Sequence, residues 1–164
     1  MERLWAPWRL ELIESEKPSG CIFCRFFEER DDEKNLVLGR SASSYVVLNK
    51  YPYNNGHLMV IPAAHHAALE DLEEGAYDDL QRLLRTAIRV VREVYGPDAM
   101  NVGMNLGRAA GAGIADHLHW HVVPRWSGDV NFMPVLAETR VIPEHLEASW
   151  KKLRPAFDRA LAGR

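Results

Sequence analysis

The sequence lacks the features that mark a membrane, secreted or general nucleic-acid-binding protein. No apolar run among its 164 residues is long enough to span a bilayer, and the start, Met1-Glu2-Arg3-Leu4-Trp5, lacks the apolar core of a signal peptide. The formal net charge is −3, whereas a nucleic-acid binder needs a basic footprint. We therefore expect a cytoplasmic protein with no membrane and no nucleic-acid partner, in which a locally positive pocket can still bind a small anion.

Cysteine is equally scarce, because the chain has only Cys21 and Cys24, arranged as Cys-Ile-Phe-Cys. A disulfide across so short a loop would stabilise an intracellular chain little, and reducing compartments disfavour it. The spacing instead favours one half of a metal site or a redox pair.

The remaining composition is that of a globular protein, with 47% hydrophobic and 26% charged residues. We expect one domain over residues 1–164, with residues 1–20 as an irregular N-terminal arm. Periodicity and turn signals predict strands over 35–40, 44–49, 57–61, 99–106 and 118–125, a short strand at 141–142, and helices over 24–32, 73–95 and 144–161, the last disturbed near Pro155. Because the strands come in groups, the predicted fold class is α+β: an antiparallel meander sheet with one long helix across it and a C-terminal helix.

Three of the seven histidines fall within five residues, as His117-Leu118-His119-Trp120-His121. Alternate residues of a strand point to the same side, so we expect the three imidazoles on one face and Trp120 on the other. Scattered core or surface histidines explain such clustering poorly. Two interpretations remain: chelation of zinc or another divalent ion, and covalent catalysis in which one imidazole attacks an acid anhydride.

The loop before the histidines helps to choose between these interpretations. The segment from Asn105 to Gly113 is rich in glycine, which lets backbone approach a ligand closely and present N–H groups to phosphate. Such a loop alone is also typical of a flexible connection. Directly before three histidines on one face, it favours phosphate chemistry over a site that only binds metal.

Two segments carry a resemblance to a known family. His117 to Val123 matches the His-x-His-x-His-apolar-apolar signature of the histidine triad (HIT) family, and the segment from Asn49 through His57 to Pro62 matches its other recurrent segment. The chain most resembles the bacterial diadenosine tetraphosphate phosphorylase branch. That likeness rests on residues 3–9, 48–54, 101–107 and 124–126.

The resemblance implies catalytic roles for four histidines. His119 takes the place of the nucleophile that forms a covalent nucleotidyl-imidazole intermediate. His121 would contact the α-phosphate and support the leaving group, and His117 would orient its neighbours. His57 matches a further histidine in the same hydrogen-bond network.

The resemblance also implies the residues that hold the nucleotide. Asn49 matches the residue that binds the ribose. Asn105, through its side-chain amide, and Gly111, Ala112 and Gly113, mainly through backbone, would bind phosphate oxygens together with His121.

A structural zinc is implied by the same likeness. Several family members bind zinc with a cysteine pair, a histidine in the Pro-x-x-His position and the first triad histidine. The corresponding residues are Cys21, Cys24, His65 and His117. His66 replaces His65 if the strand ends one residue late, and two reduced structural thiols remain the alternative without metal.

Taken together, the leading hypothesis is a nucleotidyltransferase or hydrolase acting on a nucleotide or dinucleoside polyphosphate, leaning to phosphorolysis of diadenosine tetraphosphate. The alternatives are a HIT-type hydrolase of dinucleoside polyphosphates or nucleoside phosphoramidates, and a nucleotide-binding regulatory module with little turnover. Gly113-Ile114 departs from the Gln followed by Ser or Thr of many hydrolase members, which leaves the acceptor, water or phosphate, open. A homodimer is expected by resemblance only.

Overall fold

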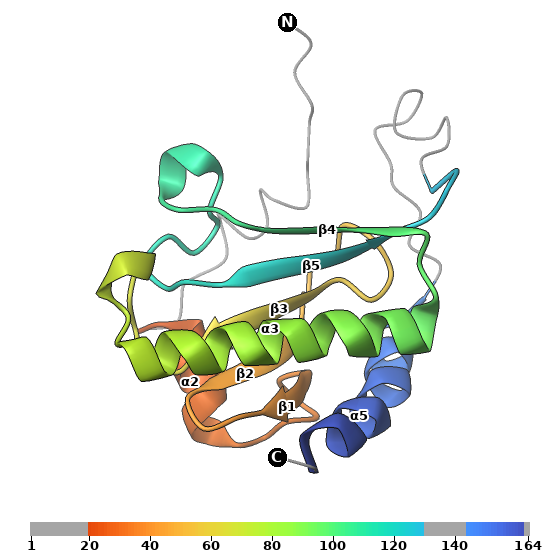
Figure 1. Ribbon diagram of the computed structural model, residues 1–164, viewed down its shortest axis with the longest axis horizontal. Helices are drawn as coiled ribbons and strands as arrows, with labels where there is room; N and C mark the ends of the chain where they lie inside the picture. The colour runs from red at the N-terminus through yellow and green to blue at the C-terminus, as the bar shows by residue number, and fades with distance from the viewer. Residues whose placement is uncertain (1–19, 130–143, 163–164) are drawn as a thin grey trace, which may run out of the picture.

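The computed structural model describes residues 20–129 and 144–162. Its five strands form one antiparallel sheet in the order β1-β2-β3-β5-β4 (Figure 1). The strands are β1 (Val37–Arg40), β2 (Ser44–Leu48), β3 (Leu58–Pro62), β4 (Ala99–Met104) and β5 (Trp120–Arg125). The first three form the predicted meander. Strands β4 and β5 pair with each other, and β5 also pairs with β3, which places β4 at the edge of the sheet. The predicted α+β class is confirmed.

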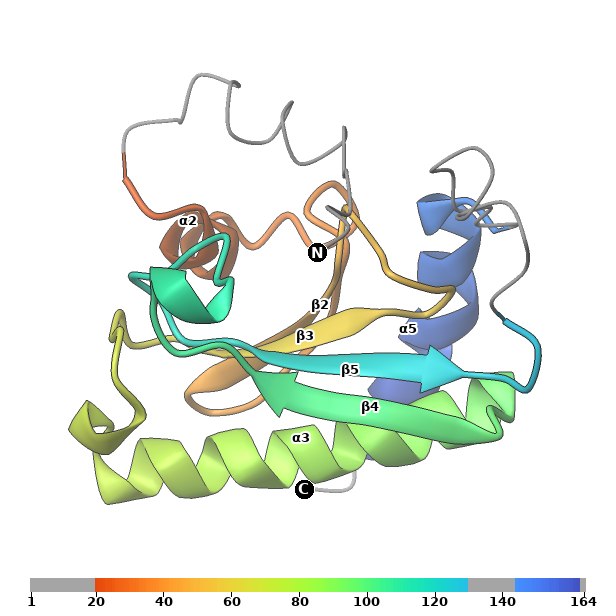
Figure 2. The ribbon, with the colours of Figure 1, turned by 90° about the horizontal axis from the view of Figure 1, so that it is seen from above.

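Helices cover both faces of the sheet. The helices are α2 (Ile22–Glu29), α3 (Glu74–Tyr95) and α5 (Leu146–Ala162), with short 3-10 turns η1 (Leu69–Asp71) and η2 (Arg108–Ala110). In Figure 2, α3 lies along one face and α2 lies on the opposite face. Residues of β2 and β3 are all buried because alternate side chains enter two separate apolar clusters, one against α3 and α5 and one against α2.

The long helix forms where the apolar spacing predicts it. Gly96, with φ +53°, ends α3 in the left-handed conformation, and its N–H donates to the Arg92 carbonyl. The C-terminal helix, in contrast, continues through Pro155, so the disturbance expected there is not seen. The predicted strand at 141–142 and nearly all of the arm over 1–20 lie outside the described residues. None of the helices described is both long and apolar enough to cross a membrane.

The strand that carries the triad is shorter than predicted. We expected it over 118–125, but β5 begins at Trp120, so His117 and His119 precede it. The pairing of β3 with β5 stops at Val60 and Trp120. Two residues further along, β3 ends at Pro62, which has no N–H to donate to a ladder. The described chain therefore places only His121 of the triad in a regular strand.

An ion-pair network anchors α2 and α5 to β1. Arg40 donates to Asp32 at 2.7 Å and to the carbonyls of Phe26 and Phe27 at the end of α2. Arg154 of α5 donates to the other oxygen of Asp32 at 2.9 Å. Burial alone would raise the pKa of the Asp32 carboxyl, but the hydrogen bonds from Arg40 and Arg154 outweigh burial and lower it.

We expect Asp32→Asn to reduce the free energy of unfolding by about 1–2 kcal/mol at neutral pH, because the hydrogen bonds from Arg40 and Arg154 lose their carboxylate. A carboxyl whose pKa is lowered by folding stabilises the protein above its unfolded-state pKa, and this contribution disappears as the pH falls through the folded-state pKa. Urea titrations at neutral and acid pH would test this, since the difference between wild type and variant should shrink in acid. An equal difference at both pH values would contradict it.

Candidate active site and metal cluster

The strand pairing brings His57, His119 and His121 together on the sheet face that α2 covers. Met59 of β3 pairs with His121 of β5, and Met59 packs in the apolar cluster against α2. Trp120 and Val122 point to the opposite side, into the α3 cluster, as alternation predicts. The rings of His119 and His121 lie 4.9 Å apart, and those of His57 and His121 lie 5.2 Å apart.

The hydrogen bonding of His119 fixes which ring nitrogen keeps a lone pair. Its Nδ1 lies 2.9 Å from the backbone carbonyl oxygen of His117. A carbonyl oxygen can only accept, so Nδ1 carries the proton and Nε2 carries the lone pair. Burial lowers the pKa of His119, which is 5% exposed, and favours the neutral, nucleophilic imidazole.

A second chain of hydrogen bonds sets the tautomers of His57 and His121. The backbone N–H of Tyr53 donates to Nδ1 of His57 at 3.0 Å, so a neutral His57 carries its proton on Nε2. That Nε2 lies 3.0 Å from Nδ1 of His121 and donates to it. A neutral His121 then carries its proton on Nε2. The site therefore combines a lone pair on His119 with a hydrogen-bond donor on His121.

Both rings of this chain are held neutral. Burial, followed by the proximity of His121 and His119, lowers the pKa of His57 to about 3. Burial and the neighbouring His119 lower the pKa of His121 to about 4. A neutral cluster is needed for the tautomer chain, because a doubly protonated ring would have no acceptor.

Asn49 lies at the other side of His57. Its backbone N–H donates to the His57 carbonyl at 3.0 Å, and its side-chain Nδ2 lies 3.4 Å from Nε2 of His57. The side-chain oxygen of Asn49 accepts from the N–H of Tyr51. The structure thus brings the sequence-predicted residues Asn49 and His57 into one cluster with His119 and His121.

The predicted phosphate loop begins beside this cluster. Gly103 pairs with His121 and Met104 with Trp120, and Asn105 follows directly. Within the loop, the N–H groups of Ala110, Gly111 and Ala112 donate to carbonyls of Gly107 and Arg108. In this conformation the loop therefore uses these three N–H groups to form its own turn, which the glycine pattern did not predict.

One aromatic contact was missed by the sequence analysis. Phe23 of α2, 3% exposed, places its ring 5.2 Å from that of His119 and 5.5 Å from that of His117. Phe23 therefore forms an apolar wall against both histidine rings. A single phenylalanine in a short helix carries no motif, so only its position next to Cys24 hinted at this role.

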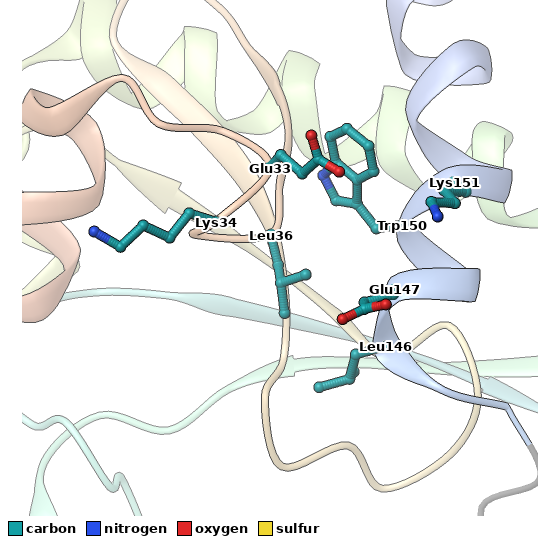
Figure 3. Close-up of a pocket in the computed structure, with 7 residues that line it drawn as sticks. All are labelled: Glu33, Lys34, Leu36, Leu146, Glu147, Trp150 and Lys151. Carbon is teal, nitrogen blue, oxygen red and sulfur yellow. The ribbon is translucent and has the colours of Figure 1, made fainter.

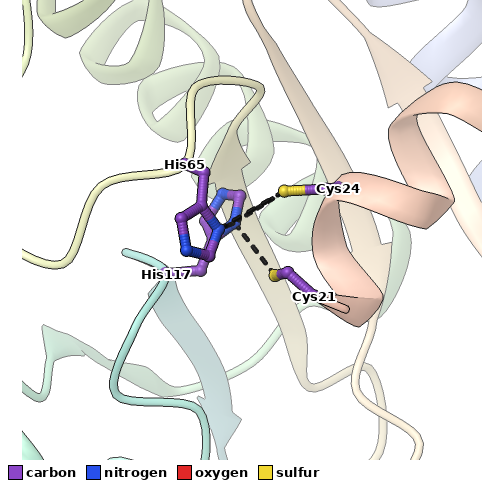
Figure 4. Close-up of side chains that lie close together, drawn as sticks. All are labelled: Cys21, Cys24, His65 and His117. Carbon is purple, nitrogen blue, oxygen red and sulfur yellow. Dashed lines mark hydrogen bonds between the residues drawn. The ribbon is translucent and has the colours of Figure 1, made fainter. Parts of the chain in front are cut away.

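His117 points away from this cluster and toward the cysteines. The donor atoms of Cys21, Cys24, His65 and His117 all lie within 4.8 Å of one another, and the group could hold a metal ion. Figure 4 shows the four side chains converging from α2, the segment after β3 and the segment before β5. His66 instead contributes its backbone carbonyl, which accepts from the N–H of Leu118.

The geometry of the cluster prepares His117 as a ligand. Its Nε2 donates to the Pro62 carbonyl at 2.8 Å, so its Nδ1 presents a lone pair to the cysteines. Nδ1 lies 3.3 Å from Sγ of Cys21 and 3.6 Å from Sγ of Cys24. Burial, then the neighbouring Cys21, raises the pKa of the Cys24 thiol to about 11. A thiolate at this position would therefore need a nearby cation to stabilise its charge.

A separate groove of 390 Å³ lies between α5 and the segment before β1 (Figure 3). It is lined by Glu33, Lys34, Leu36, Leu146, Glu147, Trp150 and Lys151. Two acidic and two basic side chains balance in charge there, and none of the histidines lines it. The groove is therefore not the site of the chemistry that the histidines support.

Comparison with known proteins agrees with this geometry. The HIT domain model matches residues 30–128. The AP-4-A phosphorylase of Mycobacterium tuberculosis is 40% identical over 168 residues, which cover 97% of this chain and 86% of that protein. The adenosine 5'-monophosphoramidase of Schizosaccharomyces pombe is 29% identical over 129 residues, 79% of this chain and 92% of that one.

A solved structure shares both the fold and part of the sequence. A zinc-bound histidine triad family protein from Mycobacterium smegmatis superposes with a TM-score of 0.69 at 27% identity, covering 88% of this chain and 98% of that one. Fold and site together define an α+β nucleotide-processing enzyme built around paired imidazoles. The chain belongs to the HIT family.

We expect His57 and His121 to remain neutral down to about pH 5, because burial holds both pKa values well below the ordinary value of about 6.5. Two-bond proton–nitrogen NMR spectra over a pH series would show the protonated ring nitrogens directly. In urea, as the control, both rings should titrate near the ordinary value. Since the unfolded chain binds more protons below that value, these histidines also lower stability as the pH falls. Midpoints near 6.5 in the folded protein would contradict this.

Proposed function

We propose that this chain is a dinucleoside polyphosphate phosphorylase that works through a covalent nucleotidyl-His119 intermediate. The observation that carries the proposal is the hydrogen bond from Nδ1 of His119 to the His117 carbonyl, which leaves the lone pair of a neutral imidazole on Nε2. The 40% identity to an AP-4-A phosphorylase over nearly the whole chain supports diadenosine tetraphosphate as the substrate.

In the first step, Nε2 of His119 attacks the α-phosphorus of the substrate. A phosphorus–nitrogen bond forms, and the bond from that phosphorus to the bridging oxygen breaks. The released polyphosphate carries away the bond's electrons, so no proton needs to be transferred when it leaves as the anion. Nε2–H of His121 donates a hydrogen bond to the phosphate and the leaving oxygen, which stabilises the developing charge.

In the second step, an acceptor attacks the same phosphorus and the phosphorus–nitrogen bond breaks. Phosphate as the acceptor yields ADP, whereas water yields AMP. Asn49 would bind the ribose, and Asn105 with the loop of Gly111, Ala112 and Gly113 would bind phosphate oxygens. Because the N–H groups of Gly111 and Ala112 are hydrogen-bonded internally, phosphate binding through these two groups requires the loop to change conformation.

A hydrolase is the second candidate. The likeness to an adenosine 5'-monophosphoramidase supports hydrolysis of a phosphoramidate or a dinucleoside polyphosphate, since the first step is the same. The two candidates differ only in the acceptor, phosphate or water.

We also propose that the metal cluster binds a structural zinc. A tetrahedral zinc with two sulfur and two nitrogen ligands separates its donor atoms by about 3.3–3.8 Å. Three of the separations are 3.3, 3.4 and 3.6 Å between sulfur and nitrogen, and the two Nδ1 atoms are 3.2 Å apart. The ion would neutralise the cysteines and join α2 to the triad segment. Four protein ligands leave no open position for substrate.

A twofold homodimer fits the exposed edge of the sheet. Among the described strands, β4 has a neighbour on one side only, with Val102 40% exposed and Leu106 just beyond it 50% exposed. An unpaired apolar edge is a ready surface for a second copy of the chain. The cytoplasmic location remains a prediction from the sequence.

Incubation with diadenosine tetraphosphate, with and without phosphate, tests the proposed reaction. We expect repeated turnover to ADP and ATP only when phosphate is present, and at most one ATP per site, from the first step, when it is absent. Turnover should fall by at least about a thousandfold in His119→Ala because the nucleophile is gone. AMP at equal rates in both conditions would mean hydrolysis and would overturn phosphorolysis. Full turnover by His119→Ala would remove the nucleophile assignment.

Metal analysis tests the zinc proposal. We expect about one zinc per wild-type chain, and a loss of most of it in Cys24→Ser, together with a lower melting temperature because α2 loses its link to His117. Ser127→Ala, far from the cluster in sequence, serves as the control for purification. Equal metal content in wild type and Cys24→Ser would rule out the site.

A further inference from the structure

The turn between β2 and β3, residues 50–56, is tied at its tip to the far end of β5. Asn54 donates from Nδ2 to a carboxylate oxygen of Asp129 at 2.8 Å and to the Pro124 carbonyl at 3.2 Å. Asp129 itself accepts from Arg125 at 2.9 Å and from the N–H of Trp126 at 3.2 Å, and its side chain is only 10% exposed. The carboxylate therefore joins the turn to the strand that carries His121.

The same turn controls the orientation of His57. The Asn54 carbonyl accepts from the N–H of His57 at 3.1 Å, and the Tyr53 N–H donates to its ring. The Tyr53 ring also stacks on that of His57, with centroids 4.9 Å apart. At the last residue of the turn, Gly56 has φ +71°, and a Cβ there would lie 2.7 Å from the Tyr95 ring. The turn is thus packed against Tyr95 at its last residue and held at its tip by the hydrogen bonds from Asn54 to Asp129 and Pro124, which we call the clamp.

We propose that Asp129 is a positioning residue for the reaction, acting through Asn54 to hold the turn that sets the His57 and His121 tautomers. The inference rests on the proposed function for its effect on turnover, but the tautomers themselves are a property of the free protein. The carboxylate accepts three donors from the turn and the end of β5. This locks the Tyr53 N–H onto Nδ1 of His57, and therefore locks the proton of His121 onto Nε2.

Loss of the hydrogen bond between Asn54 and Asp129 would change the tautomers of His57 and His121. When the Tyr53 N–H leaves Nδ1 of His57, the proton of that ring is free to occupy either nitrogen. His121 can then carry its proton on Nδ1, which leaves Nε2 without a donor for the phosphate. We expect the chemical step to slow while substrate binding changes little, because Asn105 and residues 111–113, which would bind phosphate, lie outside this turn.

Asp129→Asn and Asn54→Ala test this, with Asn55→Ala as the matched control. Asn55 belongs to the same turn, and its side-chain oxygen has no partner among the described residues, so its removal leaves the clamp intact. We expect each clamp variant to lower kcat about tenfold or more with KM within about twofold, and the double variant to be no worse than the more severe single one. Asn55→Ala should match wild type.

The tautomers provide a readout that does not depend on substrate. Proton–nitrogen NMR of the free protein should show Nε2–H on both His57 and His121 in wild type and Asn55→Ala, and a mixture of tautomers in the clamp variants. If wild type proves inactive on the substrate tested, the proposed function fails while the NMR result still decides the clamp. Wild-type tautomers in both folded clamp variants, or equal losses in Asn55→Ala, would overturn the inference. Asn54→Ala keeps the test open if Asp129→Asn does not fold.

Discussion

The backbone carbonyl of His117 fixes the orientation and the tautomer of the His119 imidazole. It accepts the proton of His119 Nδ1 at 2.9 Å, and this single bond decides that Nε2 keeps the lone pair. The position of that carbonyl depends in turn on the His117 side chain, which donates to Pro62 and lies against the cysteines. A metal ion at the cluster would therefore hold His117 and the backbone carbonyl that His119 contacts.

The roles that we propose for His119 and His121 differ because the two rings have different hydrogen-bond partners. His119 donates from Nδ1 to a backbone carbonyl and keeps a lone pair on Nε2. Nδ1 of His121 accepts from His57, whose own tautomer is set by the Tyr53 N–H, and His121 therefore keeps a donor on Nε2. Both arrangements require neutral rings, and burial supplies them by lowering the pKa values. The same burial that permits the chemistry thus costs stability in acid.

The features of the fold and the site that depend on local sequence patterns could be predicted from the sequence. Periodicity and turn signals predicted β2 and α3, and strand alternation predicted that the triad histidines share a face. The full membership of the two clusters came from the likeness to the HIT family and not from spacing alone. Sequence reasoning missed where β5 begins, because that depends on Pro62 in a different strand. It also missed Phe23 and Asp129, whose roles arise from contacts with residues far away in the chain and from no recognisable motif.

The central claim is that His119 attacks phosphorus through Nε2 and becomes nucleotidylated. The most direct measurement is mass spectrometry of the protein, denatured in alkali soon after mixing with diadenosine tetraphosphate in the absence of phosphate. The account predicts one adenylyl group on the peptide that contains His119, attached at Nε2, lost in acid and absent from His119→Ala. Turnover with no adduct, or an adduct on another residue that persists in His119→Ala, would contradict it.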